Sequence, residues 1–369
     1  IHVPFCISKC AYCNFFSLAS ESKMNDYVET LKKEIIFRKD YLGGETVKTI
    51  YFGGGTPSLL PTKSIEEIIN LIRKNFNIDD NPEITLEANP DTINKEKMSL
   101  LKQMGVNRMS VGIQSFFDDD LQYLGRRHDS RHALQVMEDL KNVNFDKITL
   151  DLIYGIPTLT EEKWNKNLET FFSTGISHLS AYALTVEPKT ILGHKIKNGD
   201  LQDINEDNTI RHYEILIEKT KEQGFEHYEI SNFAKENCRS QHNSIYWTDE
   251  KYLGLGPSAH SYDKTSRQWN VSNLTEYIKL AGNSDNCFEK EILSKEDKYN
   301  EYVMTSLRTS WGCDINKIES DYGILYKNHF LKNIKKYLDS QVMQENKTSF
   351  ILTDEGMLFA DGIASNLFL

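Results

Sequence analysis

Three cysteines at short, unequal spacing are the residues of this chain best suited to metal chemistry. Cys6, Cys10 and Cys13 form a C-x3-C-x2-C pattern directly after a short apolar segment that reads as a strand. Three thiolates can ligate three irons of a [4Fe–4S] cluster and leave the fourth iron without a protein ligand. A zinc site completed by a distant histidine or cysteine is the alternative, although the sequence offers no second cysteine pair. We predict the cluster.

An iron with an open position can bind a chelating small molecule. The amino and carboxylate groups of S-adenosylmethionine (SAM) can chelate such an iron and bring the sulfonium close enough to accept an electron. The sequence GGGTP at residues 53–57 follows a strand-like segment. Glycines there let the backbone approach a ligand closely, whereas a simple tight turn is the alternative explanation.

Polar residues stand at or near the ends of later strand-like segments. These are Glu87, Gln114 and Asp151. In a barrel of parallel strands the carboxyl ends of the strands carry the functional site, and a buried acid or amide without a partner costs free energy. We therefore predict that the three side chains converge on one ligand, the alternative being that each bonds nearby loop backbone. Arg126 is a further candidate, with an ordinary surface arginine as its alternative.

The elements that must position these residues alternate between strand and helix patterns. Strands are predicted over 47–52, 83–87, 108–114, 147–154, 178–186 and 225–230, and helices over 23–42, 64–76, 95–104, 131–142, 161–172 and 205–223. Such alternation implies an α/β fold with parallel strands and crossover helices. A partial barrel and a doubly wound open sheet both fit this pattern.

The pattern changes near residue 295. Helices are predicted over 299–308, 315–322 and 329–338, and a strand near 350–356 leads to a final helix. Helices followed by a short β-wing predict a mostly helical, winged-helix-like domain. We therefore divide the chain into a barrel at 1–235, a connecting region at 236–294 and a C-terminal domain at 295–369.

The amino-acid composition limits the kinds of partner and the compartment that we expect for this protein. The 369 residues carry a net charge of −11, which argues against nucleic acid as a partner and favours a solvated face for the C-terminal lysines. No apolar run approaches the ~20 residues of a membrane span, so only peripheral membrane association is open. The remaining cysteines, Cys238, Cys287 and Cys313, are isolated and predicted to be buried thiols. With no signal peptide in the opening residues, we predict the reducing cytoplasm.

The cysteine pattern and the glycine loop together resemble the radical SAM superfamily. That resemblance implies a partial (β/α)6 barrel that holds a [4Fe–4S] cluster and SAM. It implies SAM contacts at Tyr12, Gly54, Gly55, Thr56, Glu87, Gln114, Arg126 and Asp151, with Thr185 as a weaker match. The resemblance also implies that the aromatic ring of Tyr12 packs against the adenine of SAM.

Three later stretches, at residues 228–234, 242–247 and 252–261, are similar to HemW-type heme chaperones, proteins long described as oxygen-independent coproporphyrinogen III oxidases. The similarity covers essentially the whole chain. It implies that the protein binds heme, passes it to an acceptor protein and receives electrons for the cluster from a donor. His242, followed by Tyr246 and Trp247, is the candidate heme ligand, with a loop hydrogen-bonding role as the alternative and His260 as a second candidate.

One position separates the chaperone from the oxidase. The oxidases carry a further cysteine two residues after the third ligand, and Phe15 stands there in this chain. We therefore predict a heme chaperone without coproporphyrinogen oxidase activity. The alternatives are a radical SAM oxidase that decarboxylates porphyrinogen propionates, and a structural or regulatory protein acting through the C-terminal domain.

Overall fold

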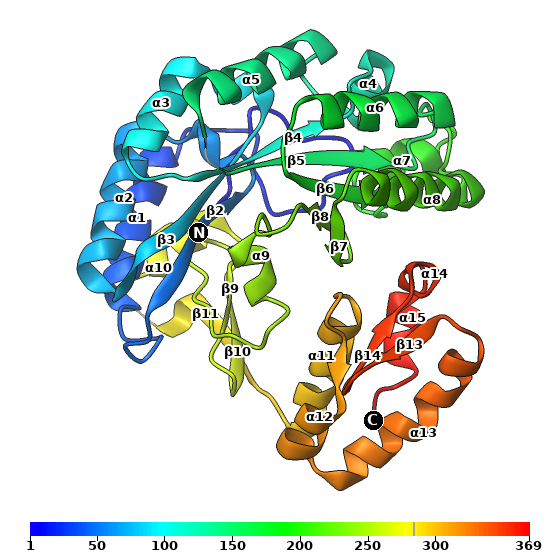
Figure 1. Ribbon diagram of the computed structural model, residues 1–369. Coiled ribbons are helices and arrows are strands. Elements are labelled where there is room, and N and C mark those ends of the chain that lie inside the picture. The colour runs from blue at the N-terminus through cyan, green and yellow to red at the C-terminus, as the bar shows by residue number, and fades with distance from the viewer. Residues whose placement is uncertain (146, 283–284) are drawn as a thin grey trace.

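A curved eight-stranded sheet forms the largest part of the protein (Figure 1). The computed structural model describes residues 1–145, 147–282 and 285–369. The strands are β1 (His2–Val3), β2 (Val47–Gly54), β3 (Ile78–Ala88), β4 (Arg108–Gln114), β5 (Lys147–Tyr154), β6 (His178–Ala183), β7 (Glu226–Glu229) and β8 (Asn232–Ala234). β1 to β6 are parallel and lie side by side in the order of the sequence.

The helices between these strands cover the outer side of the curved sheet (Figure 1). They are α1 (Met24–Phe37), α2 (Thr62–Asn75), α3 (Lys95–Gln103), α4 (Asp118–Leu124), α5 (Ser130–Val143), α6 (Glu161–Ser173), α7 (Ile191–Lys197) and α8 (Glu206–Glu222). Because β1 to β6 follow one another without a reversal of order, right-handed crossovers place successive helices on one face. A doubly wound sheet would reverse its order at a switch point. The partial barrel is therefore confirmed and the open sheet is excluded.

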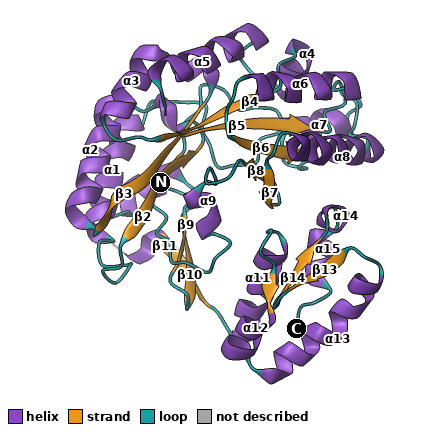
Figure 2. Cartoon of the chain, in the orientation of Figure 1, coloured by secondary structure: helices purple, strands orange, loops and turns teal. Residues whose placement is uncertain are grey.

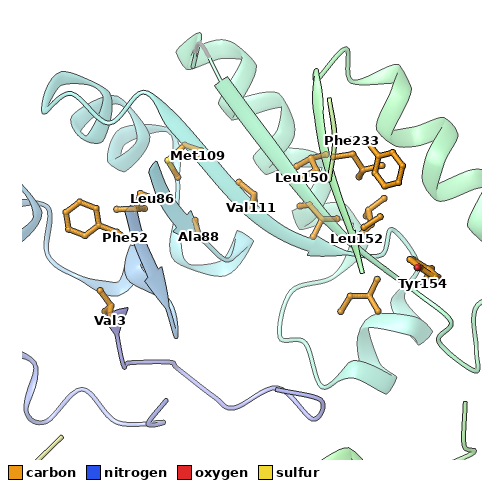
Figure 3. Packing of buried hydrophobic residues seen from close by; sticks show 14 of the residues in the cluster. Val3, Phe52, Leu86, Ala88, Met109, Val111, Leu150, Leu152, Tyr154 and Phe233 are labelled. Atoms are coloured by element: carbon orange, nitrogen blue, oxygen red, sulfur yellow. The ribbon is translucent and has the colours of Figure 1, made fainter. Parts of the chain in front are cut away.

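The apolar side chains of α2 and of the barrel strands show how the helices pack on the sheet. In α2, Ile65, Ile68, Ile69 and Ile72 recur at helical spacing, and all four are buried against the sheet. Every residue of β4 is buried, as expected for a parallel strand covered on both faces. Figure 3 shows buried side chains from neighbouring strands packed in one layer, including Phe52, Leu86, Met109 and Leu150.

The barrel ends differently from the sequence prediction. The predicted strand at 225–230 appears as β7, but β7 does not pair with β6. The chain turns back through β8, which lies antiparallel to both β6 and β7. The alternation of strand and helix patterns could not reveal this hairpin, because a reversal needs only a short turn and no change of hydrophobic pattern.

Residues 236–294 contain small elements that the sequence analysis did not resolve. They are α9 (Gln241–Ile245), β9 (His260–Tyr262), β10 (Ser266–Asn270), α10 (Leu274–Leu280) and β11 (Phe288–Ile292). The three strands form an antiparallel sheet in the order β11-β10-β9. The division of the chain at 235 and 294 remains a prediction.

The C-terminal part combines helices with a three-stranded antiparallel sheet (Figure 2). Its elements are α11 (Lys295–Leu307), β12 (Cys313–Asp314), α12 (Ile315–Tyr322), α13 (Ile324–Asp339), β13 (Met343–Asn346), β14 (Ser349–Leu352), α14 (Asp354–Met357) and α15 (Ala360–Ser365). A capping box between Ser294 and Asp297 starts α11. The strand order β12-β14-β13 provides the predicted wing beside the helices. Within the described residues, no helix is both long and apolar enough to cross a lipid bilayer.

Candidate functional site

A cavity of about 480 Å³ lies at the carboxyl ends of the barrel strands. It is lined by all of the residues that the sequence analysis selected for a cluster or for SAM: Cys6, Cys10, Tyr12, Cys13, Gly54, Gly55, Thr56, Glu87, Gln114, Arg126 and Asp151, together with Thr185. These residues come from seven separate stretches of the chain. Their convergence is the geometry that a common ligand would need.

The cysteine loop follows β1 and is held by backbone hydrogen bonds on both sides. Ala11 N donates to Leu124 O at 3.0 Å, and Leu192 N donates to Ala11 O at 2.7 Å. Gly125, with φ of +71°, allows this approach, because a Cβ there would lie 3.1 Å from Ala11 N. All three cysteines are free thiols and partly exposed, and burial raises the pKa of Cys13.

A hydrogen-bonded bridge links two of the three thiols. Thr56 Oγ1 donates to Cys6 Sγ at 3.5 Å, and Arg126 Nη1 donates to Cys10 Sγ at 3.4 Å. Asn89 joins these two donors: its Nδ2 donates to Thr56 Oγ1 at 3.1 Å, and its Oδ1 accepts from Arg126 Nη2 at 2.7 Å. Hydrogen bonds to ligating sulfurs are among the factors that set the reduction potential of an iron–sulfur cluster.

Glu87 lies in the cavity without a cationic partner among the described residues. Its Oε1 accepts a 2.6 Å hydrogen bond from Tyr51 Oη, and its Oε2 accepts one of 3.1 Å from Gly54 N. Burial raises its pKa to about 7. A carboxylate held in this way is suited to receive a ligand that brings a positive charge, such as an amino group.

Asp151 and Gln114 provide further polar groups on the wall of the cavity. Ser110 Oγ donates to Asp151 Oδ1 at 3.3 Å, and burial raises the pKa of Asp151 to about 6. Gln114 has a φ of +70°, which is unusual for a residue other than glycine, and its buried Oε1 has no hydrogen-bond partner in the described structure. The buried Nε of Arg126 is likewise without one. Unsatisfied buried atoms on the wall of a cavity indicate a missing ligand.

The residues present therefore fit both cofactors. Three thiols at the mouth of the cavity are the donor set of a [4Fe–4S] cluster, and the orphaned polar atoms beside them fit the polar groups of SAM. Among the described residues, no three His, Cys, Asp or Glu side chains converge on a position for a single metal ion.

Sequence analysis missed several residues of this cavity. Asn89, Ser110 and Tyr182 also line it. Asn89 follows Glu87 by two residues and could have been found by the same argument from strand ends. Ser110 lies within β4 rather than at its end, so only the inward face of the folded strand identifies it.

His242 lies elsewhere, at the side of the barrel formed by the first half of β2. Its ring stacks on Tyr51 with centroids 4.6 Å apart, and it lines a separate cavity of about 340 Å³. Nδ1 bonds with Thr49 Oγ1 at 2.8 Å and Nε2 with Tyr246 Oη at 3.1 Å, so both ring nitrogens have partners. Burial lowers its pKa to about 3. His260 is exposed on β9, where its ring lies 6.2 Å from that of Trp269.

A buried ion pair closes the barrel near the start of its strands. Arg108 Nε donates to Glu83 Oε2 at 3.0 Å, and both side chains are essentially inaccessible. Arg108 Nη2 also donates to the carbonyls of Cys238 and Arg239. Glu83 Oε1 accepts from His242 N at 3.1 Å. The pair thus fixes the segment that leads into α9.

Comparisons with known proteins agree with this geometry. The Radical SAM superfamily matches residues 1–171, and the HemN C-terminal domain matches residues 293–359. Heme chaperone HemW of Bacillus subtilis is 32% identical over 366 residues, which cover 98% of this chain and 97% of that protein. Heme chaperone HemW of Lactococcus lactis is 30% identical over 369 residues, covering 100% and 96%.

The fold is also found in a solved structure. Coproporphyrinogen III oxidase (HemN) from Escherichia coli, described as a radical SAM enzyme, superposes with a TM-score of 0.85 at 22% identity, covering 100% of this chain and 88% of that one. At this identity the likeness concerns the fold alone. The similarity to the two chaperones extends over their full length, and on that basis the chain belongs to the radical SAM superfamily and, within it, to the family of HemW heme chaperones.

Proposed function

We propose that this protein binds heme and passes it to an acceptor protein, and that it holds a [4Fe–4S] cluster and SAM in the cavity at the strand ends. The observation that carries the proposal is the full-length similarity to heme chaperones in a chain whose predicted cluster and SAM residues all line one cavity. The free state of all six cysteines is consistent with work in the cytoplasm.

Each group of residues in the cavity would have a separate role. Cys6, Cys10 and Cys13 would hold the cluster, which supplies a low-potential electron when an external donor reduces it. Glu87 and Asp151 would bind the polar groups of SAM, while the ring of Tyr12 would cover its adenine. The bridge through Asn89 would keep hydrogen-bond donors on two of the thiolates.

Phe15 favours the chaperone over the oxidase. Its side chain lies on the rim of the cavity and is 68% exposed. No thiol is available at the position where the oxidases have their additional cysteine. A large exposed apolar ring at the mouth of a reactive cavity offers no acid–base or metal-binding chemistry to a porphyrinogen.

Two assays on the same anaerobically reconstituted protein test this proposal. Titration with hemin should give tight binding of about one heme per chain, because a large apolar macrocycle gains from aromatic contact. Incubation with coproporphyrinogen III, reductant and SAM should give no protoporphyrinogen. Phe15→Cys serves as the matched variant for the second assay and Cys6→Ala as the cluster-free control. Repeated turnover of coproporphyrinogen by the wild-type protein, or failure to bind hemin, would overturn the proposal.

A further inference from the structure

A second cavity, of about 520 Å³, lies between the segment after α9 and the C-terminal part of the chain. Its walls come from two sides. Residues 246–252 with β9 and β10 form one wall, and α11, α12 and the turn before β12 form the other. We refer to this cavity as the inter-module cleft.

Aromatic side chains dominate both walls of the inter-module cleft. They are Tyr246, Trp247, Tyr252 and Tyr262 on the first side and Tyr302, Trp311 and Tyr322 on the second. The rings of Tyr246 and Tyr252 meet edge to face at 4.9 Å, and Tyr246 is 47% exposed. Two half-buried tryptophans thus reach one cavity from opposite sides. Walls of this kind suit a flat conjugated ligand, which can contact aromatic rings on both of its faces.

The inter-module cleft is lined by both acidic and basic side chains. Its acidic side chains already have partners: Asp249 accepts from Tyr262 Oη, Glu250 lies 4.0 Å from Lys48, Glu301 pairs with Arg267, and Asp314 accepts from Asn316 N and Thr348 Oγ1. The Lys298 ammonium has no ion pair within the described residues. Arg267 retains a buried Nε without a hydrogen-bond partner in that same part of the chain. Lys298 is therefore available to a bound anion, and Arg267, although it is paired with Glu301, keeps one unused donor.

The cleft is also distinct from the cavity that His242 lines. Both ring nitrogens of His242 are already hydrogen bonded, and one of their partners, Tyr246, is itself a wall of the inter-module cleft. A macrocycle in the cleft would therefore touch the Tyr246 end of this hydrogen bond. It would not need the imidazole as a ligand.

We propose that the inter-module cleft binds the tetrapyrrole, with Trp247 and Trp311 against its faces and with Lys298 and Arg267 near its propionates. This inference rests on the proposed heme function, which it extends by assigning the binding site and by giving the C-terminal part of the chain a direct role in it. Because the ligand would contact both walls, binding would also link the barrel to the C-terminal part.

Hemin titration of wild-type protein and single variants, followed by Soret absorbance, tests the site. Trp247→Ala and Trp311→Ala should each weaken binding by about tenfold or more through lost stacking. Trp269→Ala is the matched control, since Trp269 lies on β10 but outside the cleft, and it should bind within about twofold of wild type. Lys298→Glu should weaken binding and reduce its dependence on salt without changing the apolar walls.

Fluorescence supplies a readout that does not depend on the stability of the alanine variants. The chain has four tryptophans. Hemin should quench emission from Trp247 and Trp311 most strongly, as measured with conservative Trp→Phe variants at each position. If wild-type protein binds hemin but Trp247→Ala, Trp311→Ala and Lys298→Glu keep its affinity, the cleft is not the site and the chaperone function stands. If wild-type protein binds no hemin, the proposed function itself fails.

Discussion

Two glutamates on strand β3 behave in opposite ways, although they lie only four residues apart. Glu83, near the start of the barrel, forms an ion pair with Arg108 and accepts further hydrogen bonds from the segment that leads into α9. Glu87, near the strand end, accepts hydrogen bonds from Tyr51 and Gly54 and forms no ion pair among the described residues, and burial raises its pKa to about 7. Burying a carboxylate without a counter-charge is costly, so a protein that keeps one is suited to a ligand. The first glutamate is structural, whereas the second is available for binding.

The same contrast extends to the two arginines beside them. Arg108 donates hydrogen bonds to Glu83, to Thr149 and to two carbonyls, and it is essentially inaccessible. Arg126 lines the cavity, contacts Cys10 and keeps a buried Nε without a partner in the described structure. One end of the barrel is therefore a closed polar network and the other is an incomplete one.

The largest expected effect concerns the thiols at the incomplete end. Reconstituted protein should bind about four irons and four sulfides per chain, because three thiolates suffice to hold the cluster. Changing Cys6, Cys10 or Cys13 to Ala should abolish this binding, as measured by iron and sulfide analysis. The matched variants at Cys238 and Cys313 should retain it. One zinc and no sulfide in the wild-type protein would contradict the assignment.

Breaking the closed network should reduce stability rather than ligand binding. Arg108→Met removes the buried partner of the Glu83 carboxylate and leaves it only the partly exposed Lys147 ammonium at 3.4 Å. This variant should lower the free energy of unfolding by about 3 kcal/mol in urea titrations. Adding Glu83→Gln to this variant should restore part of the loss, because the uncompensated charge is then gone. A single variant within about 0.5 kcal/mol of wild type would show that the pair is not structural.

At the incomplete end the corresponding change should affect SAM. Glu87→Gln should weaken SAM binding by about 1–3 kcal/mol through the loss of a charge-assisted hydrogen bond, while the cluster remains. Isothermal titration of cluster-loaded protein measures this effect, and Glu96→Gln on α3 provides the surface control. Unchanged SAM affinity in Glu87→Gln, Gln114→Ala and Asp151→Asn alike would contradict the assignment of the cavity.

The protonation of Glu87 should also make the stability of the protein depend on pH. The pKa of Glu87 is raised from about 4.5 when unfolded to about 7 when folded, so the folded state binds the extra proton between these values. Its contribution to the free energy of unfolding is therefore full below about pH 4.5 and is lost as pH rises through 7. Buried histidines such as His242, with a pKa lowered to about 3, act in the opposite direction.

The quantity to measure is therefore the difference in the free energy of unfolding between wild type and Glu87→Gln. It is measured without ligand by urea unfolding between pH 5 and 8. Relative to wild type, the variant should gain stability as pH rises through this range. A difference that does not change with pH would show that Glu87 is already ionised throughout.

The sequence predicted the incomplete end of the barrel better than the closed one. Cys6, Glu87 and Gln114 stand at or near strand ends, and in a parallel sheet the strand ends share one edge, so their convergence follows from alternation alone. Asn89 obeys the same rule and was overlooked. The fold class followed from periodicity, and the helix over 315–322 was predicted to the residue.

The remaining features depend on contacts between segments far apart in the chain. The Arg108–Glu83 pair holds the backbone at Cys238 and Arg239, about 130 residues away, and no local pattern in β4 reports this. His242 and Trp247 lie within one six-residue motif, yet they line different cavities, because His242 lies on α9 and Trp247 in the turn that follows it. The motif predicted that these residues share one site, whereas in the folded protein they lie at two separate cavities.

Anomalous diffraction can show whether the incomplete end of the barrel holds a cluster and SAM. Crystals grown anaerobically with SAM should be measured at the iron and zinc absorption edges. We expect an iron anomalous peak among the sulfurs of Cys6, Cys10 and Cys13, with SAM density reaching Glu87 and Asp151. A zinc peak at the cysteines, or SAM bound outside this cavity, would contradict it.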